Sequence, residues 1–341
     1  MRKFLLAIAL LLGIFFLYYR FSEVEKVADT LQKGVLWFIL AGILLEILWY
    51  INIGASYQAI YKILGMDEKL SRLTLLSMAA FFVNIIAPSA GVGGVAVFVG
   101  NGNSNNHSPA KITIAGALFV VFDYAGFLVV LLLGLAVLAR RNKLDWPEIS
   151  ASVILVLIAL FLTSLLYLGA KSAAHLGKAL GWLARLVNNI LFPFIKKDYL
   201  SIERAYSFAK EAAEGIQALR MNPRNWIKPF LLAFSSKALL ITILMMVFLA
   251  FKVPFSAGTI IAGFSIGYLF LIVSPTPNGI GIVEGMLTLS LKSLYVPLEA
   301  AGIIVLAYRG ITFWLPLLFG FIAFRITSHA KQTEIPRTNA N

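Results

Sequence analysis

The chain has 341 residues, of which 60% are hydrophobic and 13% are charged, and its mean hydropathy is +0.87. These values exclude a soluble globular domain and indicate a polytopic membrane protein. The net charge of +13 predicts cytoplasmic loops rich in Lys and Arg and attraction to anionic lipid headgroups, rather than nucleic-acid binding. Since the chain has no cysteine, disulfides and thiolate chemistry are excluded.

Residues 4–19 form the first apolar run and directly follow Met1-Arg2-Lys3. No small-residue cleavage site comes after this run, so we expect an uncleaved first helix whose N-terminus is cytoplasmic. Residues 21–34 predict a polar loop, and residues 35–57 are apolar and long enough to cross a membrane.

The next apolar run, residues 73–87, is too short to cross a hydrocarbon core of about 30 Å. It ends at Pro88-Ser89-Ala90-Gly91-Val92-Gly93-Gly94, and a second short run then reaches Gly100. Because proline and closely spaced glycines interrupt a helix, residues 73–99 predict a helical hairpin with an opened backbone at its tip.

Residues 112–139 and 151–169 predict two further crossings, and residues 170–225 are the one sizeable polar region. In that region basic and aromatic residues recur every three or four positions, which is typical of one face of a helix. We expect a cytoplasmic region that is either an amphipathic helix lying on the membrane or the solvated face of a helical hairpin. The residues on this face are Lys171, His175, Lys178, Trp182 and Arg185.

A second interrupted region follows the crossing predicted at residues 226–250. As helices, residues 258–273 would be about 24 Å long and residues 282–294 about 20 Å, so neither spans the membrane. Between them lies Ser274-Pro275-Thr276-Pro277-Asn278-Gly279-Ile280-Gly281, whose prolines and glycines cannot continue a helix. Residues 300–324 then predict the last crossing.

Irregular backbone at membrane depth persists only where protein or a water-filled cavity surrounds it. We therefore expect residues 73–99 and 258–294 to be re-entrant hairpins that enter from opposite sides, in an all-α membrane domain of residues 1–325 with about six crossing helices. A polar tail, residues 326–341, completes the chain. This topology places most Lys and Arg, and both termini, on the cytoplasmic side. The two breaks are similar in sequence, as in an inverted repeat; a kinked helix that simply crosses is the alternative.

Six ionisable residues lie inside apolar segments, where each costs about 2.5–3.5 kcal/mol at a helix centre and is disfavoured facing lipid. Four of them fall at matching positions in the two halves of the predicted repeat, with opposite signs: Glu46 and Lys237 lie in the helix before each hairpin, and Asp123 and Arg309 lie in the helix after it. This predicts ion pairs across the repeat interface or, alternatively, a substrate or coupling site; Lys292 is expected to extend to the surface. The six are Glu46, Asp123, Lys237, Glu284, Lys292 and Arg309.

Arg309 is the best candidate to bind an anionic headgroup, because a guanidinium fork matches phosphate oxygens. Backbone N–H groups at the start of the helix after Gly281 would add a positive dipole end. Glu284 is expected to balance Arg309 in the empty site or to bind a coupling cation or proton. The predicted substrate-binding residues are Arg309, Glu284, Asp123, Tyr308, Asn278, Gly279, Gly281, Asn84 and Gly91, with Glu46 and Lys237 as a coupling site or an ion pair.

Two stretches of the second half, Pro275-Thr276-Pro277-Asn278-Gly279-Ile280-Gly281-Ile282-Val283-Glu284 and Ala307-Tyr308-Arg309-Gly310-Ile311-Thr312-Phe313-Trp314-Leu315-Pro316, resemble the PTPxGxGxxE…YR signature of the lysylphosphatidylglycerol synthase transmembrane-region family. Asn84-Ile85-Ile86-Ala87-Pro88-Ser89-Ala90-Gly91-Val92-Gly93-Gly94 and Phe122-Asp123-Tyr124 are similar to its first-half motifs. The resemblance implies a domain that flips lipids between leaflets. In multiple-peptide-resistance proteins this domain is fused to a soluble aminoacyltransferase. Only 17 residues follow Phe324 here, so we expect no enzyme activity.

The function that these features favour is a lipid flippase for an anionic or phosphate-bearing lipid, either a phospholipid or a polyprenyl-phosphate-linked lipid, in the plasma membrane. A secondary transporter of a small organic anion and a non-catalytic partner of lipid or cell-envelope enzymes remain alternatives. We expect no cofactor and no metal. The expected partners are membrane lipids, with anionic headgroups at residues 170–225, and either a second copy of the chain or a lipid-modifying enzyme.

Overall fold

A computed structural model of the chain describes residues 21–86, 92–102, 107–143, 145–195, 201, 203, 206–210, 212–213, 223–274 and 276–333. Every regular element in these ranges is helical. The predicted first helix, residues 4–19, lies outside the described residues, as do Gly91 and the second half, residues 334–341, of the tail at residues 326–341.

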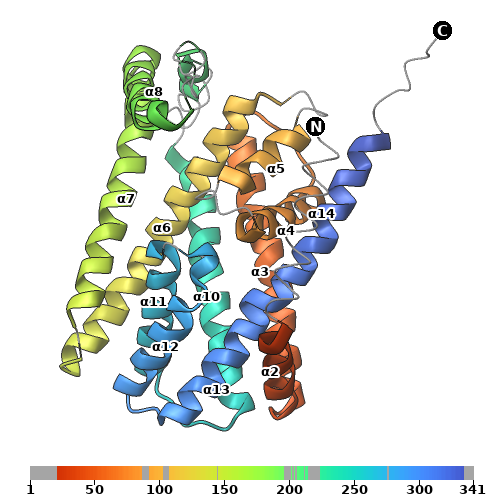
Figure 1. Ribbon diagram of the computed structural model, residues 1–341, viewed down its shortest axis with the longest axis vertical. Helices are drawn as coiled ribbons and strands as arrows, with labels where there is room; N and C mark the ends of the chain where they lie inside the picture. Colours follow the sequence, from red (N-terminus) through yellow and green to blue (C-terminus); the bar gives the residue numbers. More distant parts are fainter. Residues whose placement is uncertain are drawn as a thin grey trace.

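The helices differ mainly in length, and long apolar helices alternate with short ones (Figure 1). In chain order they are α2 (Phe21–Gln32), α3 (Leu36–Ile63), α4 (Leu70–Ile86), α5 (Val92–Gly102), α6 (Pro109–Arg140), α7 (Trp146–Lys171), α8 (Ala173–Ile195), η2 (Pro223–Trp226), α10 (Ile227–Ala250), α11 (Ala257–Val273), η3 (Pro277–Gly279), α12 (Ile282–Ser293), α13 (Leu298–Arg309), the π-helical turn η4 (Gly310–Trp314) and α14 (Leu315–Thr333).

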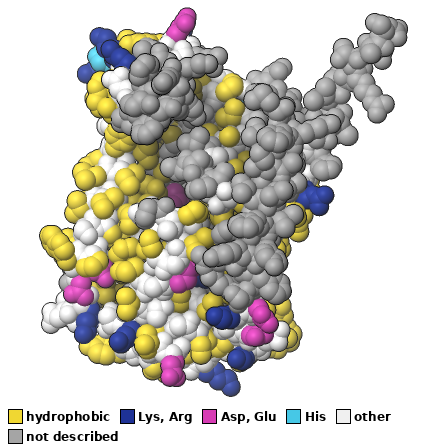
Figure 2. Space-filling model, in the orientation of Figure 1, with side chains coloured by type: hydrophobic (Ala, Val, Ile, Leu, Met, Phe, Trp, Pro, Cys, Tyr) yellow, Lys and Arg dark blue, Asp and Glu magenta, His cyan; other side chains and the backbone are white. Residues whose placement is uncertain are grey.

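Five helices in the described part of the chain are long and apolar enough to cross a membrane, so the chain is a multi-pass membrane protein. The flank over α7 is largely hydrophobic in Figure 2, and most charged side chains on that face lie toward the two ends of the molecule. These candidate spans coincide with five of the six predicted crossings, all but the first helix. They are Leu36–Ile63, Pro109–Arg140, Trp146–Lys171, Arg224–Ala250 and Leu298–Ser328.

Helices α3 and α10 pack against each other and run in opposite directions. Their antiparallel direction is fixed at one end, where the backbone N–H of Val35, just before α3, donates to the carbonyl of Ala250 at the end of α10 (2.9 Å). Each of these long helices is followed by a pair of short helices. Since α3 and α10 end at opposite ends of the molecule, the two short pairs begin at opposite ends as well (Figure 1).

Each short pair also returns to the end at which it began. His107, after α5, hydrogen-bonds through Nε2 with the carbonyl of Asp67, before α4 (3.1 Å). At the other end, the ammonium of Lys143, after α6, lies 5.9 Å from the ring centre of Tyr295, which follows α12. The structure thus contains two helical hairpins, α4–α5 and α11–α12, that open at opposite ends, and α4 contacts η3 at the tip of the other hairpin.

The two hairpins have closely matched lengths and neighbours. Helices α4 and α11 each have 17 residues, whereas α5 has 11 and α12 has 12. Helix α4 packs on α14, and α11 packs on α6, so each longer hairpin helix lies against the long helix that follows the other hairpin. Both approaches use a glycine: a Cβ at Gly320 would lie 2.6 Å from the carbonyl oxygen of Met78, and one at Gly134 would lie 2.3 Å from Oγ of Ser265.

The polar loop predicted at residues 21–34 is wrong, because residues 21–32 form helix α2. Val27 and Leu31, four residues apart, give this polar segment one apolar stripe, and Val27 is buried. The stripe packs beside Gly310, where an added Cβ would lie 2.6 Å from Val27. The packing of this stripe therefore stabilises a helix that the polar composition of the segment does not predict.

Residues 170–225 contain the amphipathic helix that the spacing of their basic residues predicted. Helix α8 leaves Trp182 exposed on the same face as its charged residues and buries Leu176 and Ala184 on the other. Tyr206 packs against that buried face at Gly177 and Gly181. The alternative helical hairpin would need a second helix, expected at about residues 201–220, and this stretch falls mostly outside the described residues.

Candidate functional site

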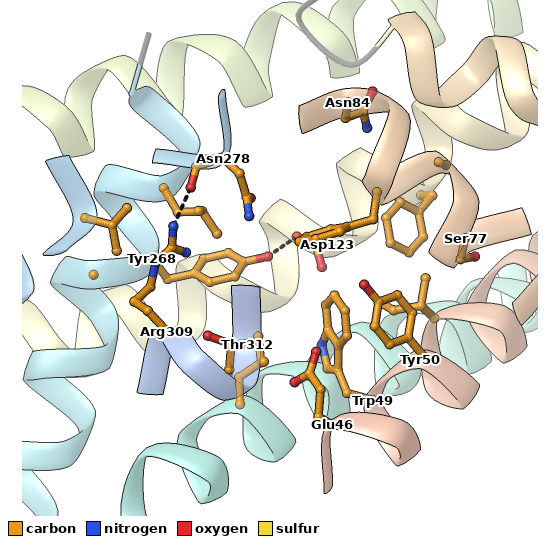
Figure 3. A pocket seen from close by; sticks show the side chains of 18 of the residues that line it. Glu46, Trp49, Tyr50, Ser77, Asn84, Asp123, Tyr268, Asn278, Arg309 and Thr312 are labelled. Carbon is orange, nitrogen blue, oxygen red and sulfur yellow. Dashed lines mark hydrogen bonds between the residues drawn. The ribbon is translucent and has the colours of Figure 1, made fainter. Parts of the chain in front are cut away.

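A cavity of about 390 Å³ lies where the two hairpins meet the long helices. Residues from both halves of the chain line it, including Asn84 of α4 and Asn278 of η3, each beside the break of its own hairpin (Figure 3). The wall combines aromatic rings with a few polar and charged groups, which is the usual make-up of a ligand site. Its polar and charged members are Glu46, Ser77, Asn84, Asp123, Asn278, Arg309 and Thr312.

Asp123 of α6 and Lys237 of α10 form one buried ion pair on the cavity wall. The ammonium of Lys237 donates to Oδ1 of Asp123 and to the hydroxyl of Tyr268, each at 2.5 Å. The Tyr268 hydroxyl in turn donates to Oδ2 of Asp123 at 3.0 Å (Figure 3). Because Lys237 is fully buried, this closed set of bonds compensates a charge that membrane depth would otherwise disfavour.

Arg309 forms the second charged contact, at the end of α13. Its Nε donates to Oε1 of Glu284 (2.7 Å), and its Nη2 donates to the carbonyl of Asn278 (3.0 Å). Oε2 of Glu284 accepts from the N–H of Gly281 (2.6 Å) and so caps the first turn of α12. One guanidinium therefore ties α13 to both sides of the second backbone break. The Glu284–Arg309 pairing predicted for an empty site is present.

The backbone of the second break adopts positive φ angles, which glycine accommodates best. Asn278, Gly279 and Gly281 have φ angles of 49°, 71° and 82°. These values lie in the left-handed region, which Gly adopts freely and Asn tolerates. An added Cβ at Gly279 would also lie 2.2 Å from Cγ2 of Val283. The two glycines thus serve as turn residues here, and Asn278 presents its carbonyl to Arg309.

At the first break, Asn84 joins the two helices of the hairpin. Its Oδ1 accepts from the N–H of Gly94 in the first turn of α5 (2.7 Å). A Cβ at Gly94 would lie 2.6 Å from Nδ2 of Asn84, so a side chain there would displace this contact. The break is shorter than residues 88–94, since the helix resumes at Val92.

Glu46 of α3 differs from the other acids of the site. Its side chain is fully buried in the cavity wall, and neither carboxylate oxygen has a hydrogen-bond partner among the described residues. The expected pairing of Glu46 with Lys237, and of Asp123 with Arg309, is therefore wrong. The residues do lie at matching places along the chain, but Lys237 faces α6 and α11, and Arg309 faces the turn before α12.

Tyr308 lines the cavity next to Arg309 in the last turn of α13, directly before the π-helical turn η4. Its carbonyl accepts from the hydroxyl of Thr312 (2.9 Å), which also faces the cavity. The guanidinium of Arg309 lies 4.5 Å from the ring centre of Phe313. Turns of this type are common at functional sites, because the extra residue redirects side chains within a helix.

Apart from Tyr308, sequence reasoning missed the aromatic residues of the site. On α3, Trp49, Tyr50, Ile53 and Tyr57 follow Glu46 at steps that keep them on its helical face, and all line the cavity. That spacing was a usable signal, since polar aromatics inside a crossing helix favour a protein-facing stripe. The other aromatic residues, which no local spacing indicates, are Phe81, Phe98, Phe119, Tyr124 and Tyr268.

Within the described ranges, no three His, Asp or Glu side chains gather in a way that could hold a metal ion. The substrate-binding roles predicted for the site residues stay predictions.

Comparison with known proteins places the chain in a family. It is 23% identical over 313 residues to a UPF0104 membrane protein of Methanocaldococcus jannaschii, covering 89% of this chain and 88% of that protein. It is 20% identical over 303 residues to a UPF0104 membrane protein of Methanothermobacter thermautotrophicus, covering 87% and 88%. A family model described as the lysylphosphatidylglycerol synthase TM region matches residues 4–320, so the chain belongs to this family of membrane domains, as its motifs predicted.

Proposed function

We propose that the protein is a lipid flippase that moves an anionic or phosphate-bearing lipid, a phospholipid or a polyprenyl-phosphate-linked lipid, between membrane leaflets. The observation that carries this proposal is the cavity of about 390 Å³ between the two broken hairpins, with charged groups at the depth of the crossing helices. Such groups are costly in a membrane and mark pathways for polar cargo. Membership of the family supports the proposal.

The proposed topology makes the two hairpins re-entrant and relates the two halves as an inverted repeat. Three features support it: the opposite directions of α3 and α10, the matched lengths of the hairpin helices, and the glycine contacts of α14 on α4 and of α6 on α11. In transporters built this way, broken helices meet near the midplane and form the substrate site. Irregular backbone there is compatible with a cavity beside it.

We propose that the protein lies in the plasma membrane with both termini in the cytoplasm. In this orientation the basic region 170–225 is also cytoplasmic, as the positive-inside rule favours. The exposed Lys171, Lys178 and Arg185 of that region would contact anionic headgroups. Membrane lipids are the proposed partners. We propose no enzyme activity, since the cavity serves to move the headgroup and not to change it.

In the proposed path the headgroup passes Arg309 while the acyl tails remain in lipid. Arg309 has five N–H groups, and its bonds to Glu284 and Asn278 use two of them. The guanidinium can therefore contact a phosphate oxygen while it still holds Glu284. The aromatic wall can pack against the glycerol or prenyl portion that follows the phosphate.

The test is leaflet exchange of labelled anionic lipid in vesicles that contain the purified protein. We expect exchange by the wild type and a loss of about tenfold or more for Arg309→Ala, which corresponds to about 1.4 kcal/mol of barrier. Lys292→Ala is the control, since Lys292 is an exposed cation on α12 outside the cavity. Equal exchange by Arg309→Ala and the wild type would contradict the site. Uptake of a small organic anion without lipid exchange would contradict the flippase and favour the transporter.

A further inference from the structure

The charges at the cavity do not balance. Its wall and the residues bonded to that wall hold two cations, Lys237 and Arg309, and three acids, Asp123, Glu284 and Glu46. Each cation already binds one acid. Glu46 is left over, with both oxygens buried and without a hydrogen-bond partner in the described part of the chain.

Among the described residues, the two cations at the cavity are already paired with other acids, so neither is left over for Glu46. One turn earlier on α3, Gly42 brings the helix against η4, where an added Cβ would lie 3.0 Å from Ile311. Among the described residues, the other titratable and charged groups that line the cavity are Tyr50 and Tyr57 of α3, Asp123 and Tyr124 of α6, Tyr268 of α11, and Tyr308 and Arg309 of α13, and Lys237 of α10 is bonded to Asp123; α4 lines it with the polar residues Ser77 and Asn84.

An ionised carboxylate in this position would be a buried charge without a partner, which is strongly unfavourable at membrane depth. It would also repel the phosphate of an anionic headgroup that approaches Arg309. A proton on Glu46 removes both costs at once. The hydroxyl of Tyr50, also buried without a partner among the described residues, could then bond either to the protonated acid or to the cargo.

We propose that Glu46 holds a proton in the resting protein and that an anionic headgroup enters the cavity only while that proton is present. This inference rests on the proposed function in its second half, the entry of the headgroup. Its first half, the protonated Glu46, concerns the empty protein alone. The two halves are therefore tested separately.

The first experiment uses infrared difference spectroscopy on the full-length protein in vesicles at neutral pH, with no added substrate. A protonated carboxyl gives a C=O stretching band distinct from those of carboxylates. We expect such a band in the wild type, its loss in Glu46→Gln, and its retention in Glu148→Gln. Glu148 is the matched control, because its Oε2 is also buried without a partner among the described residues, but it lies at the start of α7 outside the cavity. A spectrum unchanged by Glu46→Gln would overturn the proposal.

The second experiment measures anionic-lipid exchange as a function of pH, with the same pH on both sides of the vesicle. Because the protonated form is the competent one, exchange should fall as pH rises, by about tenfold per pH unit once Glu46 loses its proton. Glu46→Gln should lose this slope, whereas Glu148→Gln should keep it. A slope that persists in Glu46→Gln, or a requirement for sodium instead of protons, would overturn the coupling. A Glu46 band in the first experiment with no lipid exchange at any pH would contradict the flippase and leave the proton site standing.

Discussion

The two hairpins are built from helices of similar length, but different interactions hold their tips. At the first tip a neutral amide, Asn84, accepts one hydrogen bond from Gly94. At the second tip an ion pair, Glu284–Arg309, joins a neighbouring helix to both sides of the break. The second hairpin is tied again further along α11, where Tyr268 joins the pair of Asp123 and Lys237.

This difference separates two ways of holding the two helices of a hairpin together at its tip. A neutral bond within a hairpin sets the shape of that hairpin alone, and its loss has a small local cost. Buried ion pairs between helices fix the hairpin against the rest of the protein, and removal of one partner leaves an uncompensated charge. Substitutions should therefore have larger effects around α11–α12 than around α4–α5.

The largest expected effect is that of Lys237→Met. It leaves the Asp123 carboxylate buried without its cation, so we expect the free energy of unfolding to fall by about 3–5 kcal/mol. Thermal unfolding of the purified protein in detergent measures this change. The double variant Asp123→Leu with Lys237→Met removes both charges and should recover most of the loss; a double variant as unstable as the single one would show that the loss does not come from the uncompensated Asp123 charge.

A smaller effect is expected for Gly279→Ala at the second break. The φ of 71° is unfavourable for alanine, and its Cβ would contact Val283 at 2.2 Å, so we expect a loss of about 1–3 kcal/mol. Gly285→Ala is the control, because Gly285 lies within α12 and an added Cβ meets nothing within 4 Å. Comparable melting temperatures for the two variants would show that the turn does not require its glycine.

The smallest effect is expected at the first tip, for Asn84→Ala. Loss of the single bond to Gly94 should cost about 1 kcal/mol. Gly94→Ala should cost more than Asn84→Ala, because the new Cβ would lie 2.6 Å from the Asn84 amide. Adding Asn84→Ala to Gly94→Ala should then relieve part of that cost in a thermal unfolding assay, whereas strictly additive losses would mean that the two residues do not touch.

Much of the fold could be predicted from the sequence because membrane depth limits the choices. The length of an apolar run decides whether it spans the membrane, and closely spaced prolines and glycines such as Pro275, Pro277 and Gly279 interrupt a helix. Thus α11 and α12 begin or end within about a residue of the predicted runs. Helix α2 was missed because its composition is polar, and what Val27 and Leu31 pack against, around Gly310, is distant in sequence.

The sequence indicated which charged residues are buried, but it did not indicate which of them contact each other. Buried charges stand out in an apolar sequence, so Glu46, Asp123, Lys237 and Arg309 were found by composition alone. Which acid meets which base depends on the rotation of α10 and α13 about their axes, which no local pattern specifies. The bonds of Arg309 to Glu284 and Asn278 additionally depend on the shape of the second break.

The most direct test of the central claim, that headgroups cross through the cavity between the two breaks, is lipid exchange before and after the cavity is filled. The chain has no cysteine, so Thr312→Cys places a single thiol at the cavity wall, and a bulky maleimide attached there should occupy much of the space. We expect labelling to stop exchange of anionic lipid, while the same label on Ser150→Cys, an exposed position on α7, leaves it intact. Exchange that continues at the unlabelled rate after complete labelling of Thr312→Cys would contradict the cavity as the path.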